Sequence, residues 1–188
     1  MSDSQIRVAF HKSILREAHS CVGTIILNEL GLKNGESRAD IAVLNGKMIG
    51  YEIKTEKDSL TRLASQVNSY SQIFDRAFVI LAEKHLKKAK AIIPDWWGIY
   101  LIQSSNSENH TFKYNRKAKM NPSQDSFSIA QLLWKDEALA VANTIFNCNL
   151  KSNTNRQEIY EIISSKCPPK KLSKIVMDFM KKREGWRK

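Results

Sequence analysis

The sequence predicts an α/β protein with a mixed β-sheet flanked by helices, followed by a helical C-terminal extension. Two observations carry this prediction. Residues 1–103 alternate between helical and strand periodicity, in the order helix, three strands, helix, strand, helix, strand. After a polar stretch at 104–125, the apolar pattern is helical alone. We therefore expect an α/β domain over residues 1–117 and a basic helical extension over residues 118–188.

Local patterns define the elements of the first part. Apolar residues at a spacing of four predict a helix over Gln5–Ser20, and a β-branched run predicts a strand over Val22–Leu27. Two strands are expected on either side of Asn45-Gly46, a dipeptide typical of tight hairpin turns. The hairpin strands are Arg38–Leu44 and Met48–Thr55, and they are followed by a helix over 58–74, a strand at Ala77–Ala82, a helix at Lys84–Ile93 and a strand at Trp97–Gln103.

The second part begins with Thr111–Asn115, a segment compatible with an edge strand. Three helices are then expected, at Phe127–Phe146, Arg156–Ser165 and Lys170–Glu184. The last two could form a helix-turn-helix, although two prolines in the turn between them argue against it.

Composition excludes several classes of protein. Hydrophobic residues make up 42% of the chain, yet no apolar run approaches about 18 residues, so a membrane span is not expected. The N-terminus has no secretory leader pattern. Three widely spaced cysteines without a CxxC pair favour a reduced, cytoplasmic protein and argue against a zinc site. His11 and His19, eight residues apart, are not expected to chelate a metal.

The charge balance favours a polyanionic partner. The net charge is +11, of which residues 104–188 contribute +8. A strongly basic region is typical of nucleic-acid binding, and Lys170, Lys171 and Lys174 on the last expected helix are candidate phosphate contacts. An exposed basic face without a ligand is the alternative. Trp96-Trp97 could stack on bases, but a place in the core is favoured.

The hairpin gathers charged residues on one face of the sheet. If Leu44 pairs with Met48, the register places Asp40 opposite Glu52, and strand alternation places Lys54 on the same face as Glu52. Gly50, beside them, would leave open space. The other face is apolar and suited to the core, with Ala39, Ile41, Val43, Ile49, Tyr51 and Ile53.

Two carboxylates directly across a strand pair repel each other by on the order of 0.2–1 kcal/mol. A divalent cation would remove this conflict, since Mg²⁺ takes carboxylate oxygens together with waters and substrate phosphates. A neighbouring lysine can hold a phosphate or orient an attacking water. The alternative is an exposed charged strand face with a simple Lys–Glu pair.

The spacing of Asp40 and Glu52-Ile53-Lys54 on a hairpin between two helices resembles the PD-(D/E)XK nuclease superfamily. The wider string resembles a small bacterial and phage branch of that superfamily, chiefly of uncharacterised nuclease-like proteins. The resemblance covers most of the chain, and it departs from the pattern where Ala39 replaces the proline before Asp40. The string comprises Glu29-Leu-Gly, Gly35…Arg38-Ala-Asp-Ile-Ala, Gly50-Tyr-Glu-Ile-Lys54, Asp58…Arg62-Leu, Gln66…Tyr70, Phe74-Asp-Arg76, Pro94-Asp-Trp-Trp-Gly98, Leu132-Leu-Trp-Lys-Asp-Glu-Ala138 and Arg183…Gly185-Trp186.

The resemblance implies a restriction-endonuclease-like fold and a role for each matching residue. Asp40 and Glu52 would bind the metal, with the backbone carbonyl of Ile53 as a further ligand, and Lys54 would be the catalytic lysine. Glu29 matches an additional acidic residue that helps to bind the metal, with Glu17 as its competitor. The remaining candidates are Gln66, which would point at the site, and Arg62, which could contact phosphate or pair with Asp58.

These observations predict a Mg²⁺-dependent deoxyribonuclease that hydrolyses phosphodiester bonds with an activated water, Mn²⁺ being able to replace Mg²⁺. The expected partner is nucleic acid, and the resemblance implies DNA rather than RNA. A homodimer or a further protein partner is compatible with the sequence. One rival is a nucleic-acid-binding module that keeps the fold with little or no cleavage. The other is an interaction protein in which the hairpin charges are only surface.

Overall fold

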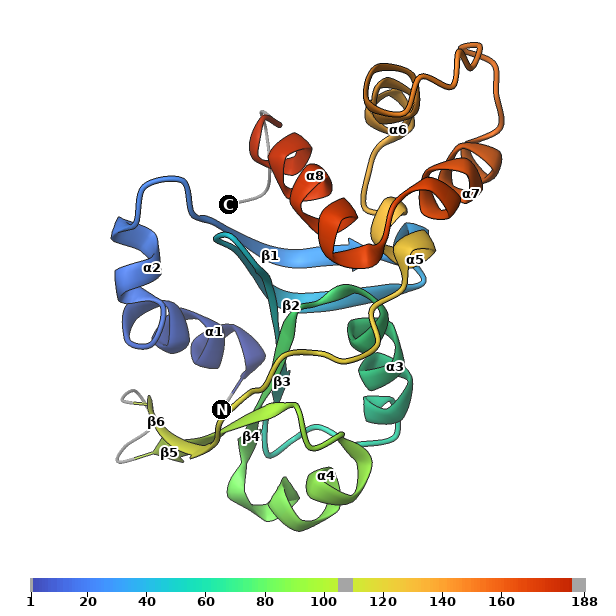
Figure 1. The fold of residues 1–188 in the computed structure, drawn as a ribbon. Helices are drawn as coiled ribbons and strands as arrows, with labels where there is room; N and C mark the ends of the chain where they lie inside the picture. Colours follow the sequence, from blue (N-terminus) through green and yellow to red (C-terminus); the bar gives the residue numbers. More distant parts are fainter. Residues whose placement is uncertain (1, 105–109, 184–188) are drawn as a thin grey trace.

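A computed structural model describes residues 2–104 and 110–183 and contains a six-stranded mixed sheet (Figure 1). The strands lie side by side in chain order. The pairs β3–β4 and β4–β5 are parallel, and the other neighbours are antiparallel. The prediction of a mixed sheet, including the edge strand, is confirmed. The strands are β1 (Ile25–Leu32), β2 (Ser37–Leu44), β3 (Met48–Lys54), β4 (Arg76–Ala82), β5 (Gly98–Ser104) and β6 (His110–Arg116).

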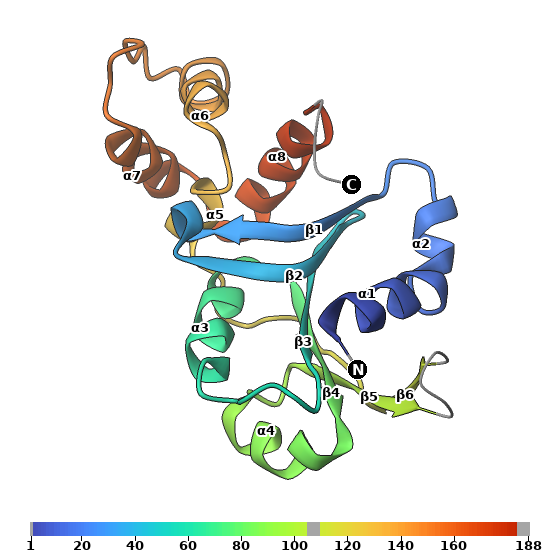
Figure 2. The ribbon, with the colours of Figure 1, turned by 180° about the vertical axis from the view of Figure 1, so that it is seen from behind.

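Helices cover both faces of this sheet, as the sequence predicts (Figures 1 and 2). α1 and α2 lie against one face, α3 and α4 against the other, and the later helices gather beyond β1. The described helices are α1 (Asp3–Lys12), α2 (Arg16–Ser20), η1 (Lys33–Gly35), α3 (Leu63–Ile73), η2 (Glu83–His85), α4 (Leu86–Ile92), α5 (Ser126–Ala130), α6 (Lys135–Ala140), η3 (Val141–Ile145), α7 (Arg156–Lys166) and α8 (Pro169–Lys181).

Each face of the sheet has its own hydrophobic core. Phe10 of α1 packs with Tyr51 and Ile80 on one face. On the other face, Tyr70 and Trp97 belong to a larger cluster that runs on into the C-terminal helices. Trp96 and Trp97 are both buried, so the core prediction for this pair is confirmed.

The predicted hairpin register is correct. Leu44 pairs with Met48, and the ladder continues to Ile41 and Tyr51. All but one of the predicted inward-facing apolar residues belong to the core beneath α1. The exception is Ala39, which packs in the opposite core. The β2–β3 ladder ends at Ile41 and Tyr51, one residue before Asp40 and Glu52, so the predicted direct pairing of these two carboxylates is not part of the ladder.

Two N-terminal boundaries differ from the prediction. The expected helix over 5–20 is divided into α1 and α2, because the Ser13 hydroxyl bonds the Ala9 carbonyl at 2.8 Å and buried Leu15 turns into the core. The first strand begins at Ile25 rather than Val22, because a turn at Gly23 (φ 77°) leaves Val22 fully exposed.

The helix expected over 58–74 begins only at Leu63. Asp58 is held in the preceding loop, where its carboxylate accepts hydrogen bonds from the backbone N–H and the hydroxyl of Thr55 at 2.7 and 2.6 Å. These bonds stabilise a turn in place of helix.

The long helix expected over 127–146 is also divided, into α5, α6 and the π-helical η3. The break lies at Trp134, whose backbone is extended and donates a hydrogen bond to Glu137 at 2.8 Å. This bond begins α6 as a new helix. Glu184, the expected end of the last helix, lies outside the described residues. Among the described residues, none of the helices is long and apolar enough to cross a bilayer.

Candidate active site

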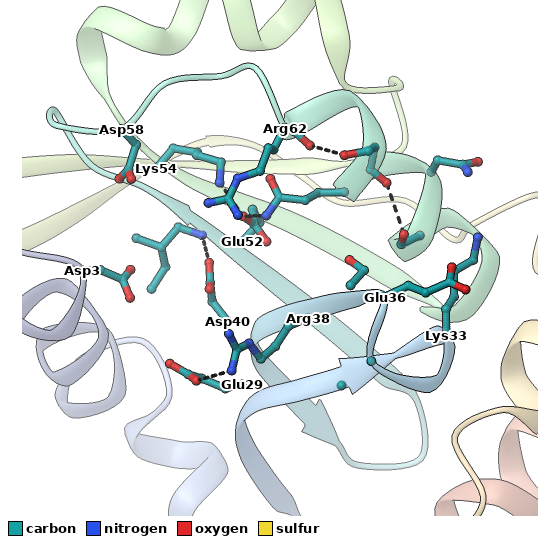
Figure 3. A pocket seen from close by; sticks show the side chains of 18 residues that line it. Asp3, Glu29, Lys33, Glu36, Arg38, Asp40, Glu52, Lys54, Asp58 and Arg62 are labelled. Carbon is teal, nitrogen blue, oxygen red and sulfur yellow. Dashed lines mark hydrogen bonds and ion pairs between the residues drawn. The ribbon is translucent and has the colours of Figure 1, made fainter.

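One pocket brings together seven of the residues proposed from the sequence (Figure 3). It has a volume of about 950 Å³. It lies between the N-terminus of α1, the connection between β1 and β2, strand β3 and the first turns of α3. The proposed residues that line it are Glu29, Asp40, Glu52, Ile53, Lys54, Arg62 and Gln66.

Glu52 lies at the centre of this pocket and is almost completely buried, at 1% exposure. Lys54, also buried, donates to its Oε1 at 2.6 Å. The Gln66 amide donates to the same oxygen, and the Tyr70 hydroxyl donates to Oε2 at 2.7 Å. Burial raises the pKa of Glu52, while the charge of Lys54 and these hydrogen bonds oppose that shift. The carboxylate is therefore held in one orientation by three donors.

Asp40 lies where β2 and β3 separate. Its Oδ2 accepts the backbone N–H of Ile53 at 2.7 Å, so a side chain takes the place of a strand-to-strand backbone bond. The Tyr70 hydroxyl accepts the Asp40 N–H at 3.3 Å. Burial, and then the negative charge of Glu52, raise the pKa of Asp40 to about 7. The predicted conflict between these two carboxylates is thus present in the electrostatics of the folded protein.

Glu29 is held by two arginines. Arg7 of α1 and Arg38 of β2 each donate to its carboxylate at 3.0 Å, and Arg7 also pairs with Asp3 at 2.8 Å. The guanidinium of Arg7 reaches to 3.9 Å from Asp40. The backbone of Glu29 is left-handed (φ 56°), a conformation that costs a non-glycine residue on the order of 1 kcal/mol. This strained residue therefore joins α1 and β2 at the edge of the pocket.

The other proposed residues have distinct surroundings. Arg62 is exposed at the start of α3 and lines the pocket. The i,i+4 helical pairing suggested for Asp58 and Arg62 is wrong, because Asp58 precedes the helix and bonds Thr55. Lys170, Lys171 and Lys174 are exposed on α8 and are not among the residues that line the pocket.

Gly50 does not open space beside the carboxylates. A Cβ at this position would lie 2.6 Å from the ring of Phe74, so the glycine allows α3 to end close against β3. The Asp75 carboxylate fixes this approach, because it accepts the Met48 N–H at 2.7 Å. Gly50 is therefore a packing residue that positions the strand carrying Glu52.

The pocket provides an oxygen-rich donor set. Among the described residues, no group of three His, Cys, Asp or Glu side chains is placed to hold a metal ion. Asp40 and Glu52, with the backbone carbonyl of Ile53, would supply only part of a coordination shell. This set fits Mg²⁺, which usually keeps several waters and takes one or two protein carboxylates. Burial raises the pKa of both carboxylates, and the negative charge of Glu52 adds to the shift at Asp40, so a bound cation would favour their charged forms.

Two residues of the site were not proposed from the sequence. Tyr70 has the periodicity of a core residue, and its ring is indeed buried, yet its hydroxyl contacts both carboxylate-bearing strands. A buried tyrosine hydroxyl needs a hydrogen-bond partner, and this requirement is the feature of the sequence that could have indicated a polar contact for Tyr70. Arg7 lies on α1, and its part in the site depends on how α1 packs across the sheet.

The fold and pocket define a mixed-sheet α/β protein with a buried acid–lysine cluster at the divergence of two strands. Its sequence matches the family model described as bacteriophage P4 protein cII over residues 2–186, and the chain belongs to that family. One relative is protein cII of Enterobacteria phage P4, which is 26% identical over 183 residues, covering 97% of this chain and 68% of that protein.

Two solved structures show distant similarity. A protein of unknown function from Silicibacter pomeroyi, SPO1766, aligns over 73% of this chain and 87% of its own, with a TM-score of 0.41 and 16% identity. SfsA from Pyrococcus furiosus, solved in complex with Ca²⁺, aligns over 61% of this chain and 65% of its own, with a TM-score of 0.37 and 16% identity.

Proposed function

We propose that this protein is a metal-dependent nuclease that hydrolyses phosphodiester bonds in nucleic acid, DNA being the favoured substrate. The observation that carries the proposal is the placement of Asp40, Glu52 and Lys54 in one pocket, with Lys54 bonded to Glu52 at 2.6 Å. The resemblance of this residue pattern to PD-(D/E)XK nucleases supports the same reading, and the preference for DNA rests on that resemblance.

In the proposed site, Asp40, Glu52 and the Ile53 carbonyl would hold Mg²⁺ or Mn²⁺. When bound, such an ion would supply charge stabilisation for the phosphate and lower the pKa of a water. Tyr70 and Gln66 fix the orientation of Glu52, since both donate hydrogen bonds to its carboxylate. Lys54 places its ammonium group beside that carboxylate, where it would contact a phosphate oxygen or the attacking water.

Substrate binding would use positively charged side chains at the rim of the pocket. Arg38 and Arg62 are exposed on opposite sides of it, on β2 and at the start of α3 (Figure 3). The guanidinium of Arg38 is oriented by Glu29, which leaves other N–H groups of its fork for a phosphate. Lys170, Lys171 and Lys174 would extend the contact to more distant phosphates through charge alone.

The test is digestion of circular and linear DNA, double- and single-stranded, in Mg²⁺, Mn²⁺ or EDTA. Lys54→Ala is expected to abolish cleavage and to leave DNA binding largely intact, because Lys54 is one of 30 Lys and Arg residues. Lys57→Ala, which removes an exposed lysine from the neighbouring loop, is the matched control and should cleave normally.

Melting curves of both variants establish that each is folded. DNA binding by the wild-type protein without cleavage of any substrate would contradict the proposed activity and favour a binding module with this fold. Absence of both metal and DNA binding would favour the interaction protein.

A further inference from the structure

The break between α1 and α2 creates a second cluster of potential metal ligands. Because the chain turns at residues 13–15, the ring of His19 folds back onto His11, and Nδ1 of His11 lies 3.0 Å from Nε2 of His19. Their eight-residue spacing does not predict this contact, since a continuous helix would separate the two rings by about 12 Å along its axis.

The outer nitrogen of His11 is also fixed. Its Nε2 lies 3.0 Å from Oδ1 of Asn28 on β1, and an amide oxygen can only accept, so Nε2 carries the proton. Nδ1 therefore presents its lone pair toward His19. Metal-binding histidines commonly have this arrangement, in which the second ring nitrogen donates to a carbonyl or carboxylate oxygen.

We propose that His11 Nδ1 and His19 Nε2 form a binding site for a borderline divalent transition metal of the Zn²⁺, Ni²⁺ or Cu²⁺ class. Imidazole nitrogen suits these ions and does not suit Mg²⁺. The site is therefore chemically distinct from the carboxylate pocket, and it does not depend on the proposed nuclease activity.

The separation of the two nitrogens is close to what such an ion requires. With metal–nitrogen bonds of about 2.1 Å, a tetrahedral angle needs the nitrogens about 3.4 Å apart, so the rings must separate by about 0.4 Å. His19 is exposed and lies on a short helix, which makes this adjustment easy. To bind the metal, the neutral His19 ring must carry its proton on Nδ1 instead of Nε2. Both facing nitrogens then have a lone pair for the ion.

Two features bear on the affinity of the site. Burial lowers the pKa of His11, the hydrogen bond with Asn28 opposes this shift, and the charges of His19 and Arg7 add to it, so the net direction favours the neutral ring that ligation requires. The chain supplies two nitrogens, and water would fill the other positions, because no third His, Cys, Asp or Glu is grouped with them among the described residues. We expect a dissociation constant in the micromolar range.

The test uses full-length protein without a histidine tag and with Asp40→Asn to disable the carboxylate pocket. Titration calorimetry with Zn²⁺ is expected to show one site per chain, and Mg²⁺ is expected to give no heat at this site. The electron paramagnetic resonance spectrum of bound Cu²⁺ should show coupling to two imidazole nitrogens.

Adding His19→Ala should weaken Zn²⁺ binding at least tenfold and remove one nitrogen coupling. His11→Gln should do the same while keeping a group that can donate to Asn28. Ser20→Ala, an exposed neighbour on α2, is the matched control and should bind normally. Zn²⁺ affinity unchanged by both histidine substitutions, or a Cu²⁺ spectrum without imidazole coupling, would overturn the proposal, whatever the outcome of the DNA digestion.

Discussion

At the scale of residues, the site depends on two carboxylates, of which Glu52 is buried and Asp40 is half-buried. Glu52 has three hydrogen-bond donors, whereas Asp40 accepts the Ile53 N–H and has Arg7 only at 3.9 Å. Asp40 thus has fewer hydrogen-bond donors than Glu52, and burial together with the charge of Glu52 raises its pKa to about 7. Its protonation should be visible in the stability of the protein.

Asp40→Asn should therefore stabilise the protein in EDTA at high pH. The folded-state pKa of Asp40 is raised, so its contribution to stability is present in acid and is lost as the pH rises from about 4 through 7. At pH 8 we expect the variant to exceed wild type by about 1–4 kcal/mol, and at pH 4 by almost nothing. Urea unfolding at both pH values measures this difference.

The same substitution tests the proposed metal ligand. Millimolar Mg²⁺ or Mn²⁺ should raise the melting temperature of wild type and not that of Asp40→Asn, because a ligand stabilises only the state that binds it. A variant less stable than wild type at pH 8 in EDTA would contradict the charge conflict. A retained metal response would require ligation by Glu52 and Glu29 without Asp40.

At the scale of elements, the sequence predicts the hairpin best, because local signals define it fully. Asn45-Gly46 fixes the turn, and the turn fixes the register from Leu44–Met48 to Ile41–Tyr51, which brings Asp40 and Glu52 to the end of that ladder. Helix boundaries are predicted less well. Ser13 and Asp58 each make a local hydrogen bond that competes with helix, and the Trp134 N–H makes a capping bond that begins a new helix; periodicity reveals neither kind of bond.

The basic face of α8 allows a test of nucleic-acid binding. Replacing Lys170, Lys171 and Lys174 with Gln should weaken DNA binding and flatten its salt dependence, since each phosphate contact contributes about −0.9 to the slope of log K against log salt. Fluorescence anisotropy over a salt series measures the slope.

A matched control removes the same charge from another helix. Lys87, Lys88 and Lys90 are exposed on α4, and their replacement with Gln should leave the slope nearly unchanged if α8 is the contact surface. Equal effects of the two triple variants would instead assign the attraction to overall charge.

At the scale of the whole molecule, the larger core runs from the sheet into the C-terminal helices. Leu172 and Val176 of α8 belong to the same buried cluster as Val67 of α3 and Leu44 of β2. The sequence predicts a boundary at residue 117 because the pattern changes there. The helices before and after residue 117 share one core through long-range packing, which local sequence patterns do not predict. The boundary stays a prediction that unfolding can test.

Leu172→Ala removes a fully buried side chain from this cluster and should lower the free energy of unfolding by about 2–5 kcal/mol. If the two parts unfold together, the far-ultraviolet circular dichroism and the tryptophan fluorescence should follow one coincident transition in both wild type and variant. A separate early transition confined to the variant would show that residues 118–188 unfold as an independent unit.

The hydroxyl bridge of Tyr70 gives the molecule an optical reporter of its own site. The Tyr70 ring lies 5.2 Å from the ring of Trp97, and its hydroxyl donates to Glu52, so a change of charge at that carboxylate is one hydrogen bond and one ring contact away from a buried indole. Cation binding should therefore alter the intrinsic emission of the protein. Trp97→Phe should silence that signal and Trp134→Phe should preserve it, which would allow occupancy to be followed in solution without any label.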